Sequence, residues 1–271
     1  MTPASGSAAA RPTFQVAAFG ESVDQWPLPT ATTPAELWLR AVAAGGQGRY
    51  ASAHADLAAL RRQVDSGSPS ALASLAHSTT ASLLRQLGWH QRARRWDGLA
   101  LCSAGDDEAR ADAIVGLAAD ALGVGRYAAS ATLLAQARLL PGGCARQPVR
   151  LAWVSAELAM VTGAGAEAVR YAHDAVELAA ADGVSARHRV KSEVVLAAAL
   201  CAAGRLDDSR LAADRALTST GRWALVPLRW AVASLLAGIG SEVHTTAEVA
   251  QIRDQAADLV CRRGGAFAGA G

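Results

Sequence analysis

Two groups of basic side chains are the residues of this sequence whose types and spacing could bind a ligand. In the first group, Trp89 and Trp96 are interleaved with Arg85, Arg92, Arg94 and Arg95. Indole rings can stack on bases while guanidinium groups contact phosphates, so this pattern could hold single-stranded nucleic acid. The alternative is an ordinary helix surface, on which arginines extend to solvent over partly packed tryptophans. The surface interpretation is favoured, and a net charge of +2 does not by itself indicate a nucleic-acid partner.

The second basic group is the run Arg187-His188-Arg189-Val190-Lys191, which opens a predicted helix. Positive charge at a helix N-terminus opposes the helix dipole and is mildly unfavourable. This placement indicates an anionic partner. A surface run at the edge of a loop explains it nearly as well.

Sequence patterns typical of enzymes are weak. Residues 123–128 and 163–168 match the dinucleotide-binding pattern G-x-G-x-x-A, but each match follows a predicted helix instead of the required strand. The histidines form no H-E-x-x-H motif and have no nearby cysteine. No G-x-S-x-G or Walker sequence occurs. We therefore expect no catalytic, cofactor-binding or metal site and a protein that is not an enzyme. An active site built from dispersed residues is the weaker alternative.

Composition indicates a folded, all-helical protein. The 271 residues are 51% hydrophobic, which suffices for a sizeable core and excludes disorder throughout. No run alternates as a strand would. The apolar runs around residues 194–203 and 230–238 are shorter than the roughly 20 residues that span a bilayer, and no signal peptide is evident. The four cysteines lie 42 to 60 residues apart, as expected for free thiols in a reducing cytoplasm.

A repeated phrase reveals the organisation of the chain. Residues 48–60 read GRYASAHADLAAL and residues 125–137 read GRYAASATLLAQA. The glycine of this phrase recurs at intervals of 37 to 41 residues, as Gly48, Gly88, Gly125, Gly163 and Gly204. An alanine stands seven residues before each glycine, and an alanine or serine stands five residues after it. Glycine tolerates the positive φ of a tight turn, and small side chains let two helices cross closely. The pattern predicts antiparallel helix pairs, with a looser sixth copy at Ala231 and Gly238.

Each such pair buries only one face, so neighbouring pairs must stack into a solenoid. The residues resemble the tetratricopeptide repeat (TPR) family. Leu117-Ala118 stands at the family's Leu-Gly position, Ser130 and Leu134 at its A-x3-F positions, and Pro141 at its closing proline. In the second copy, Asp97 fits this pattern poorly.

The repeat is longer than that of the family. Its mean interval of 39 residues exceeds the family's period of about 34, and is similar to longer-helix relatives that serve as sensor modules of bacterial transcription regulators. The resemblance covers residues 34–263. It implies an all-α, right-handed α-solenoid of about five to six antiparallel helix pairs.

The ends of the chain are expected to differ from the repeats. Residues 1–12 are expected to be a disordered tail and residues 264–271 a flexible one. The first repeat helix is apolar on most sides, so residues 13–33 should cover it. Apolar residues of this segment supply the cover: Phe14, Val16, Phe19, Trp26 and Leu28.

The TPR resemblance also implies a binding groove, because the first helix of each pair lines the concave face in that family. Counting along these helices gives eight groove candidates: Trp38, Ser82, Arg85, Arg150, Trp153, Glu157, Met160 and Lys191. Tryptophan and methionine would anchor apolar side chains, while arginine and lysine would fix carboxylates or phosphate.

The expected function is therefore that of a non-enzymatic adaptor or scaffold in the cytoplasm, which binds a protein or peptide segment with anionic groups. One alternative is a regulatory or sensor module that acts with a transcription factor or binds a small ligand. Nucleic-acid binding through the Arg/Trp surface is the weakest of the three, and no membrane partner is expected. The sequence leaves open the oligomeric state and whether Trp38 and Trp153 line the groove or fill the core.

Overall fold

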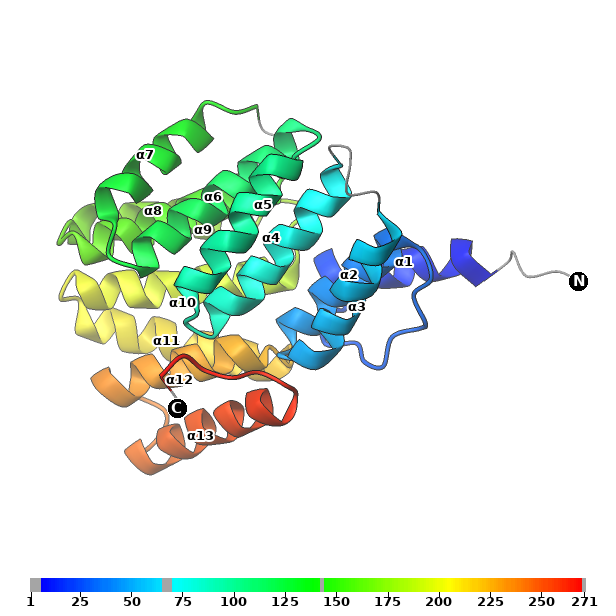
Figure 1. Cartoon of the computed structure of the whole chain (residues 1–271). Helices are drawn as coiled ribbons and strands as arrows, with labels where there is room; N and C mark the ends of the chain where they lie inside the picture. The colour runs from blue at the N-terminus through cyan, green and yellow to red at the C-terminus, as the bar shows by residue number, and fades with distance from the viewer. Residues whose placement is uncertain (1–5, 65–69, 142–143, 270–271) are drawn as a thin grey trace, which may run out of the picture.

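Thirteen α-helices and no β-strand make up the described part of the chain, which comprises residues 6–64, 70–141 and 144–269 of a computed structural model (Figure 1). The helices are α1 (Gly6–Phe19), α2 (Pro34–Gly46), α3 (Tyr50–Gln63), α4 (Ala71–Gln86), α5 (His90–Ser103), α6 (Asp107–Gly123), α7 (Tyr127–Arg138), α8 (Arg146–Val161), α9 (Gly165–Ala179), α10 (Ala186–Ala202), α11 (Leu206–Arg222), α12 (Val226–Ile239) and α13 (Thr246–Arg262). The prediction of an all-α fold is confirmed.

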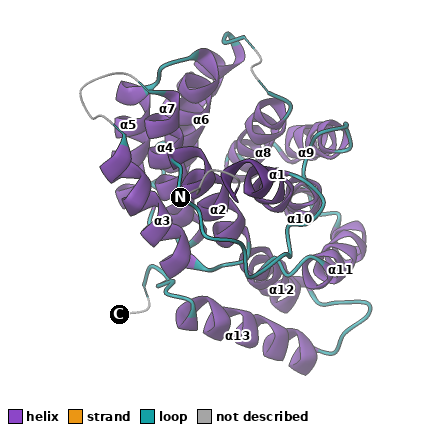
Figure 2. Ribbon diagram, turned by 90° about the vertical axis from the view of Figure 1, so that its right-hand side faces the viewer, coloured by secondary structure: helices purple, strands orange, loops and turns teal. Residues whose placement is uncertain are grey.

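Twelve of these helices form six consecutive pairs, from α2 with α3 to α12 with α13. Neighbouring pairs pack on one another as well, for example α5 on α6 and α9 on α10. The described chain is therefore an α-solenoid, as Figures 1 and 2 show from two directions.

The turn within each of the first five pairs is made by the predicted glycine. All five glycines have positive φ, with values of 71° at Gly48 and 76° at Gly125. The residue after the glycine then donates its backbone N–H to the carbonyl five residues earlier, as from Arg49 to Ala44 and from Arg126 to Ala121, both at 2.8 Å. This is the Schellman arrangement, which satisfies carbonyls at a helix end and needs a residue that tolerates the left-handed conformation.

The small residues of the repeat lie at the helix crossings. The five alanines that precede the glycines and the five small residues that follow them are all 0% exposed: Ala41, Ala81, Ala118, Ala156, Ala197, Ala53, Ala93, Ser130, Ala168 and Ser209. Ser209 also donates a hydrogen bond of 2.7 Å to the carbonyl of Ala197 on the partner helix. The close approach that the sequence pattern predicted is present in all five pairs.

The sixth copy was aligned wrongly by the sequence. Helix α12 continues through Gly238 and ends instead at Gly240, whose φ is 87°. Ala231 is only half-buried, and the buried positions at this crossing are taken by Val232, Ala233 and Leu236. The sequence placed the turn two residues too early because it carried the earlier spacing forward to the nearest glycine.

The N-terminal segment packs against the first pair and reaches the fifth. Phe14 is fully buried in one apolar cluster with Leu37 of α2, while Val23 packs with Val190 of α10. Val16 is 43% exposed and does not contribute the expected cover. Helix α1 begins at Gly6, so residues 6–12 are helical where the sequence suggested disorder, and residues 1–5 lie outside the described part.

The C-terminal segment, residues 263–269, joins the last pair to the first pairs. The carbonyl of Arg263 accepts a hydrogen bond of 2.9 Å from the N–H of Ala51, and the N–H of Ala268 donates one of 2.7 Å to the carbonyl of Leu87. The ring of Phe267 lies 4.6 Å from that of Trp230. The expected flexible tail is therefore packed as far as residue 269, and residues 270–271 are not described. These contacts close the solenoid on itself.

Replacing Ala118 by Leu should destabilise the protein, because Ala118 is 0% exposed at the crossing of α6 and α7 and a larger side chain would force the helices apart. We expect the free energy of unfolding, measured by urea denaturation, to fall by about 1–3 kcal/mol. The matched control is Ala135→Leu on the exposed side of α7, which should change it little. Equal effects of the two substitutions would show that the crossing lies elsewhere.

Replacing Phe267 by Ala tests the closure of the solenoid. This half-buried ring packs on Trp230, so its loss should lower the free energy of unfolding by about 1–2 kcal/mol. Leu139, which is 85% exposed, provides the control substitution Leu139→Ala. A Phe267→Ala variant as stable as the control would mean that the C-terminal segment is not held in solution.

Candidate functional site

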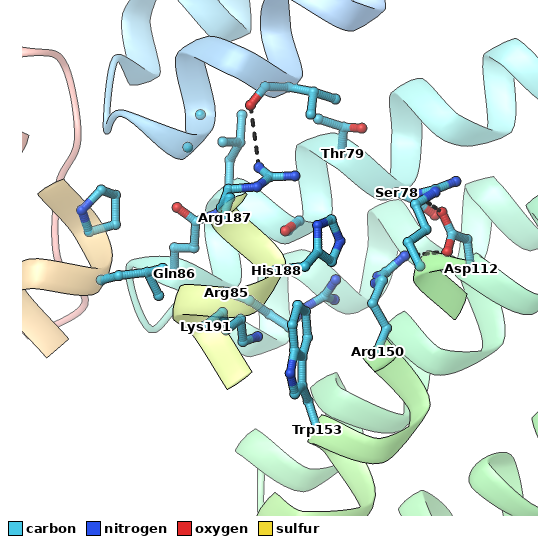
Figure 3. Close-up of a pocket in the computed structure, with 18 of the residues that line it drawn as sticks. Ser78, Thr79, Arg85, Gln86, Asp112, Arg150, Trp153, Arg187, His188 and Lys191 are labelled. Atoms are coloured by element: carbon cyan, nitrogen blue, oxygen red, sulfur yellow. Dashed lines mark hydrogen bonds and ion pairs between the residues drawn. The ribbon is translucent and has the colours of Figure 1, made fainter. Parts of the chain in front are cut away.

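The first helices of the six pairs surround a cavity of about 340 Å³, part of which Figure 3 shows. Helices α2, α4, α6, α8, α10 and α12 all contribute to its wall. Phe19 at the end of α1 and His90 at the start of α5 complete it. The cavity therefore occupies the concave side of the solenoid.

The structure brings seven of the eight groove candidates together around this cavity: Trp38, Ser82, Arg85, Arg150, Trp153, Glu157 and Lys191. Met160 is not among the lining residues and packs, half-buried, against the apolar cluster of α8 to α10. The candidate position of Met160 is therefore a correction: its side chain belongs to this apolar cluster and not to the cavity wall. Whether the other seven residues bind a ligand stays a prediction.

The two tryptophans belong to the core as well as to the cavity wall. Trp153 is only 6% exposed and donates its indole N–H to Ser192 Oγ at 2.8 Å. Trp38 is half-buried and donates to Thr79 Oγ1 at 3.0 Å. The sequence left open whether these rings line the groove or fill the core. Both do both: each ring is hydrogen-bonded to a neighbouring pair and also lines the cavity.

The groove candidates did not include several residues of the cavity wall, notably Arg146, Trp230, and Arg187 and His188 of the basic run. Two of them carried a usable signal. Arg146 precedes Arg150 by four residues, and Arg187 precedes Lys191 by four, so each shares a helix face with a residue that the sequence did identify. Arg187, His188 and Lys191 of the basic run thus face the cavity, whereas Arg189 pairs with Glu21 outside it. The side chain of Ser185 caps the start of α10 at the N–H of His188.

A buried arginine joins two buried aspartates behind one part of the wall. The Arg85 guanidinium contacts the carboxylate of Asp97 and lies 2.8 Å from Oδ1 of Asp120. Burial and the neighbouring Asp97 raise the pKa of Asp120 to about 7, although Arg85 opposes the shift. Burial also raises the pKa of Asp97. The two carboxyl groups therefore share a proton near neutral pH, and Asp97, a poor fit to the TPR pattern, is explained by this contact.

A second group pairs two arginines of α8 with acids of α6. Arg146 lies 2.8 Å from Glu108 Oε1 and 2.8 Å from Asp112 Oδ2, and Arg150 contacts the other oxygen of Asp112. Burial alone would raise the pKa of Asp112, but the attraction of Arg150 and Arg146 outweighs burial and lowers it. Both oxygens of this carboxylate are thus already engaged.

Two further cations of the wall have no such partner. No carboxylate lies within 4.0 Å of the Arg187 or Lys191 nitrogens in the described residues, and Arg187 makes one long hydrogen bond, 3.4 Å to the carbonyl of Val42. Burial, with the charges of Arg146 and Arg150, lowers the pKa of Arg187 to about 10. Burial also lowers the pKa of Lys191, whose ammonium lies 4.3 Å from the Trp153 ring.

His188, between these two cations on α10, is a neutral member of the wall. Its ring stacks on Trp153 at 5.3 Å, and Ser185 Oγ lies 2.6 Å from its Nδ1. Burial and the surrounding cations, Arg187 first, lower its pKa well below the usual value. At neutral pH the imidazole is therefore uncharged and does not add to the positive charge of the cavity.

The structure divides the Arg/Trp group that suggested nucleic-acid binding. Arg85 faces the cavity, whereas Arg92, Arg94 and Arg95 are exposed on α5. Trp89 donates its indole N–H to the carbonyl of Ala266 at 2.6 Å and so takes part in the C-terminal closure. The group is thus not one continuous surface.

Comparison with known proteins yields no relative from which to transfer a function: no protein-family model and no curated protein matches the sequence. Among the described residues, no helix is both long and apolar enough to cross a bilayer. Within the same residues, no three His, Cys, Asp or Glu side chains are grouped as metal ligands.

The shared proton of Asp97 and Asp120 predicts a pH-dependent stability. A carboxyl group whose pKa is raised on folding stabilises the protein at low pH, and this contribution is lost as pH rises toward the folded pKa of about 7. Between about pH 5 and 7, the free energy of unfolding of the wild type should fall by up to about 1.4 kcal/mol per pH unit relative to that of Asp120→Asn.

Urea denaturation of both proteins at several pH values measures this difference. Asp207→Asn is the control, because the Asp207 side chain is 92% exposed. If the free energies of unfolding of the wild type and Asp120→Asn change with pH in the same way, Asp97 and Asp120 do not share a proton.

Proposed function

We propose that this protein is a non-enzymatic regulatory module that binds a small ligand in the cavity enclosed by its helical repeat. The observation that carries the proposal is a single cavity to which the first helices of all six pairs contribute. Its volume of about 340 Å³ lies near the lower end of the range for small-molecule sites, about 300–1,000 Å³. The C-terminal segment joins the two ends of the solenoid, which brings the first helices of the first and last pairs around the same cavity.

The composition of the wall supports the same function. Apolar and aromatic side chains such as Trp38, Leu83 and Val154 stand beside seven charged ones, and sites for small organic ligands combine apolar walls with polar groups that fix the ligand's orientation. The resemblance of the repeats to TPR-like sensor modules of bacterial transcription regulators supports a regulatory role. The four cysteines are free thiols, which favours a cytoplasmic location.

Adaptor function remains the second candidate, and one observation favours it. A separate cavity of about 380 Å³ lies between α7, α8 and the start of α9, and its wall includes Tyr127 and Tyr171. Tyr127 is 41% exposed, and tyrosines are frequent anchors of protein interfaces. Binding of a protein partner there is compatible with binding of a small ligand inside the repeat.

Screening a library of small organic compounds by thermal denaturation tests the proposed function. A compound that binds only the folded protein stabilises it by about 2.7 kcal/mol at one hundred times its dissociation constant, so true ligands should raise the melting temperature. Ser82→Trp should abolish this shift, because the half-buried Ser82 lines the cavity and an indole would occupy the space.

Thr132→Trp, at an exposed position of α7, is the matched control and should retain the shift. The proposal is wrong if no compound stabilises the wild type, or if the same compounds stabilise Ser82→Trp equally well.

A further inference from the structure

Arg187 and Lys191 form a cationic pair on one face of α10, separated by one helical turn (Figure 3). Both line the cavity, and neither has a carboxylate within 4.0 Å among the described residues. The other three cations of the wall differ in this respect: Arg85, Arg146 and Arg150 each contact at least one buried aspartate. The pair is therefore the part of the cavity wall whose positive charge the protein leaves unbalanced.

The surroundings of the pair make this imbalance costly. Removing a cation from water is unfavourable unless an anion or several acceptors replace the lost hydration. Arg187 has one long hydrogen bond as compensation, and its position in the first turn of α10 sets its charge against the helix dipole. Arg146 and Arg150 add repulsion from α8.

No acid of the described residues lies at ion-pair distance from the two cations. Asp112 is engaged on both oxygens by Arg146 and Arg150, and Asp97 and Asp120 share Arg85. Glu157 attracts Lys191 but lies beyond ion-pair distance. An arrangement that is unfavourable in the empty protein is expected where a ligand supplies the missing charge, since binding sites commonly sacrifice stability for function.

The chemistry of the two cations defines the group that would neutralise them. A guanidinium presents parallel N–H donors that match the two oxygens of a carboxylate, and an ammonium adds up to three more. The Trp153 ring lies against the Lys191 ammonium, Val42 lies beside Arg187, and the Trp38 ring lines the same cavity. A ligand that satisfies both parts has an oxyanion at one end and an apolar or aromatic body.

We infer that the cavity binds a small organic acid, with its carboxylate on Arg187 and Lys191 and its apolar body against the tryptophans. The inference rests on the proposed function, because it assumes that the cavity is the ligand site. It adds the class of ligand and the two residues that select it.

Two probes of nearly the same shape test the charge requirement: 2-naphthoate and its neutral analogue 2-naphthamide. Titration of the wild-type protein, followed by calorimetry or tryptophan fluorescence, should give an affinity about tenfold or more higher for the acid, as expected when hydrogen bonds to charged groups are added. Arg187→Gln and, separately, Lys191→Gln should lose most of this preference and leave the affinity for the amide unchanged.

Controls separate binding from folding. Arg205→Gln is the matched substitution, because the Arg205 side chain is 52% exposed and pairs with Asp208 outside the cavity. It should bind both probes like the wild type. Arg187→Gln should melt at the same temperature as the wild type or higher, because it removes an unbalanced charge; a lower melting temperature would contradict the inferred imbalance.

The outcomes distinguish the inference from the proposed function. Equal affinity of the wild type for acid and amide, or a preference for the acid that survives in both variants, overturns the organic-acid inference and leaves the cavity as a ligand site. Binding of neutral library compounds without binding of 2-naphthoate has the same meaning. If neither probe nor any library compound binds in the cavity, the proposed function itself fails.

Discussion

The close crossing of two helices within each pair is the constraint on which the rest of the structure depends. Ala118 and Ser130 illustrate it: they lie on α6 and α7 of one pair, and both are 0% exposed. With the helices held this close, larger apolar residues are displaced to the flanks, where they can pack only against a neighbouring pair. The helix pairs therefore stack because of the close crossing within each pair, and the stacked pairs form a concave surface.

Segments at both ends of the chain then join distant helix pairs around the concave side. The N-terminal segment runs from the first pair to α10, where the carbonyl of Gly20 accepts a hydrogen bond of 3.3 Å from the N–H of Ala186. The C-terminal segment joins α12 to the first pairs through Phe267 and Trp230. Helix α1 packs on α2, and the Phe19 ring at its end lies 5.4 Å from the Arg146 guanidinium of α8. The two ends of the chain therefore help to hold the pairs around the cavity together.

The charges inside the cavity follow a consistent division of roles. Arginines on α4 and α8 are neutralised by aspartates of α5 and α6, which ties neighbouring pairs together across the wall. A buried pair of this kind adds little net stability, but its loss is costly because the remaining charge is left unpaired. Against this balanced background, the cations of α10 are the exception. That contrast, and not the number of basic residues, is what points to a ligand.

The sequence by itself determined the helix pairs, because the signals for them are local: a glycine that adopts positive φ and small residues at fixed distances from it in each repeat. It also identified seven of the residues that meet in the cavity, since equivalent positions of stacked repeats project from equivalent faces. It could not place the turn before α12, where Ala224 adopts a φ of 51° without glycine. Nor could it show that Phe267 packs on Trp230, or that Arg187 lacks an acid while Arg85 has two. Those contacts depend on the total rotation of the solenoid between its first and last pairs. That rotation is the sum of small rotations between successive pairs, and no local stretch of sequence determines it.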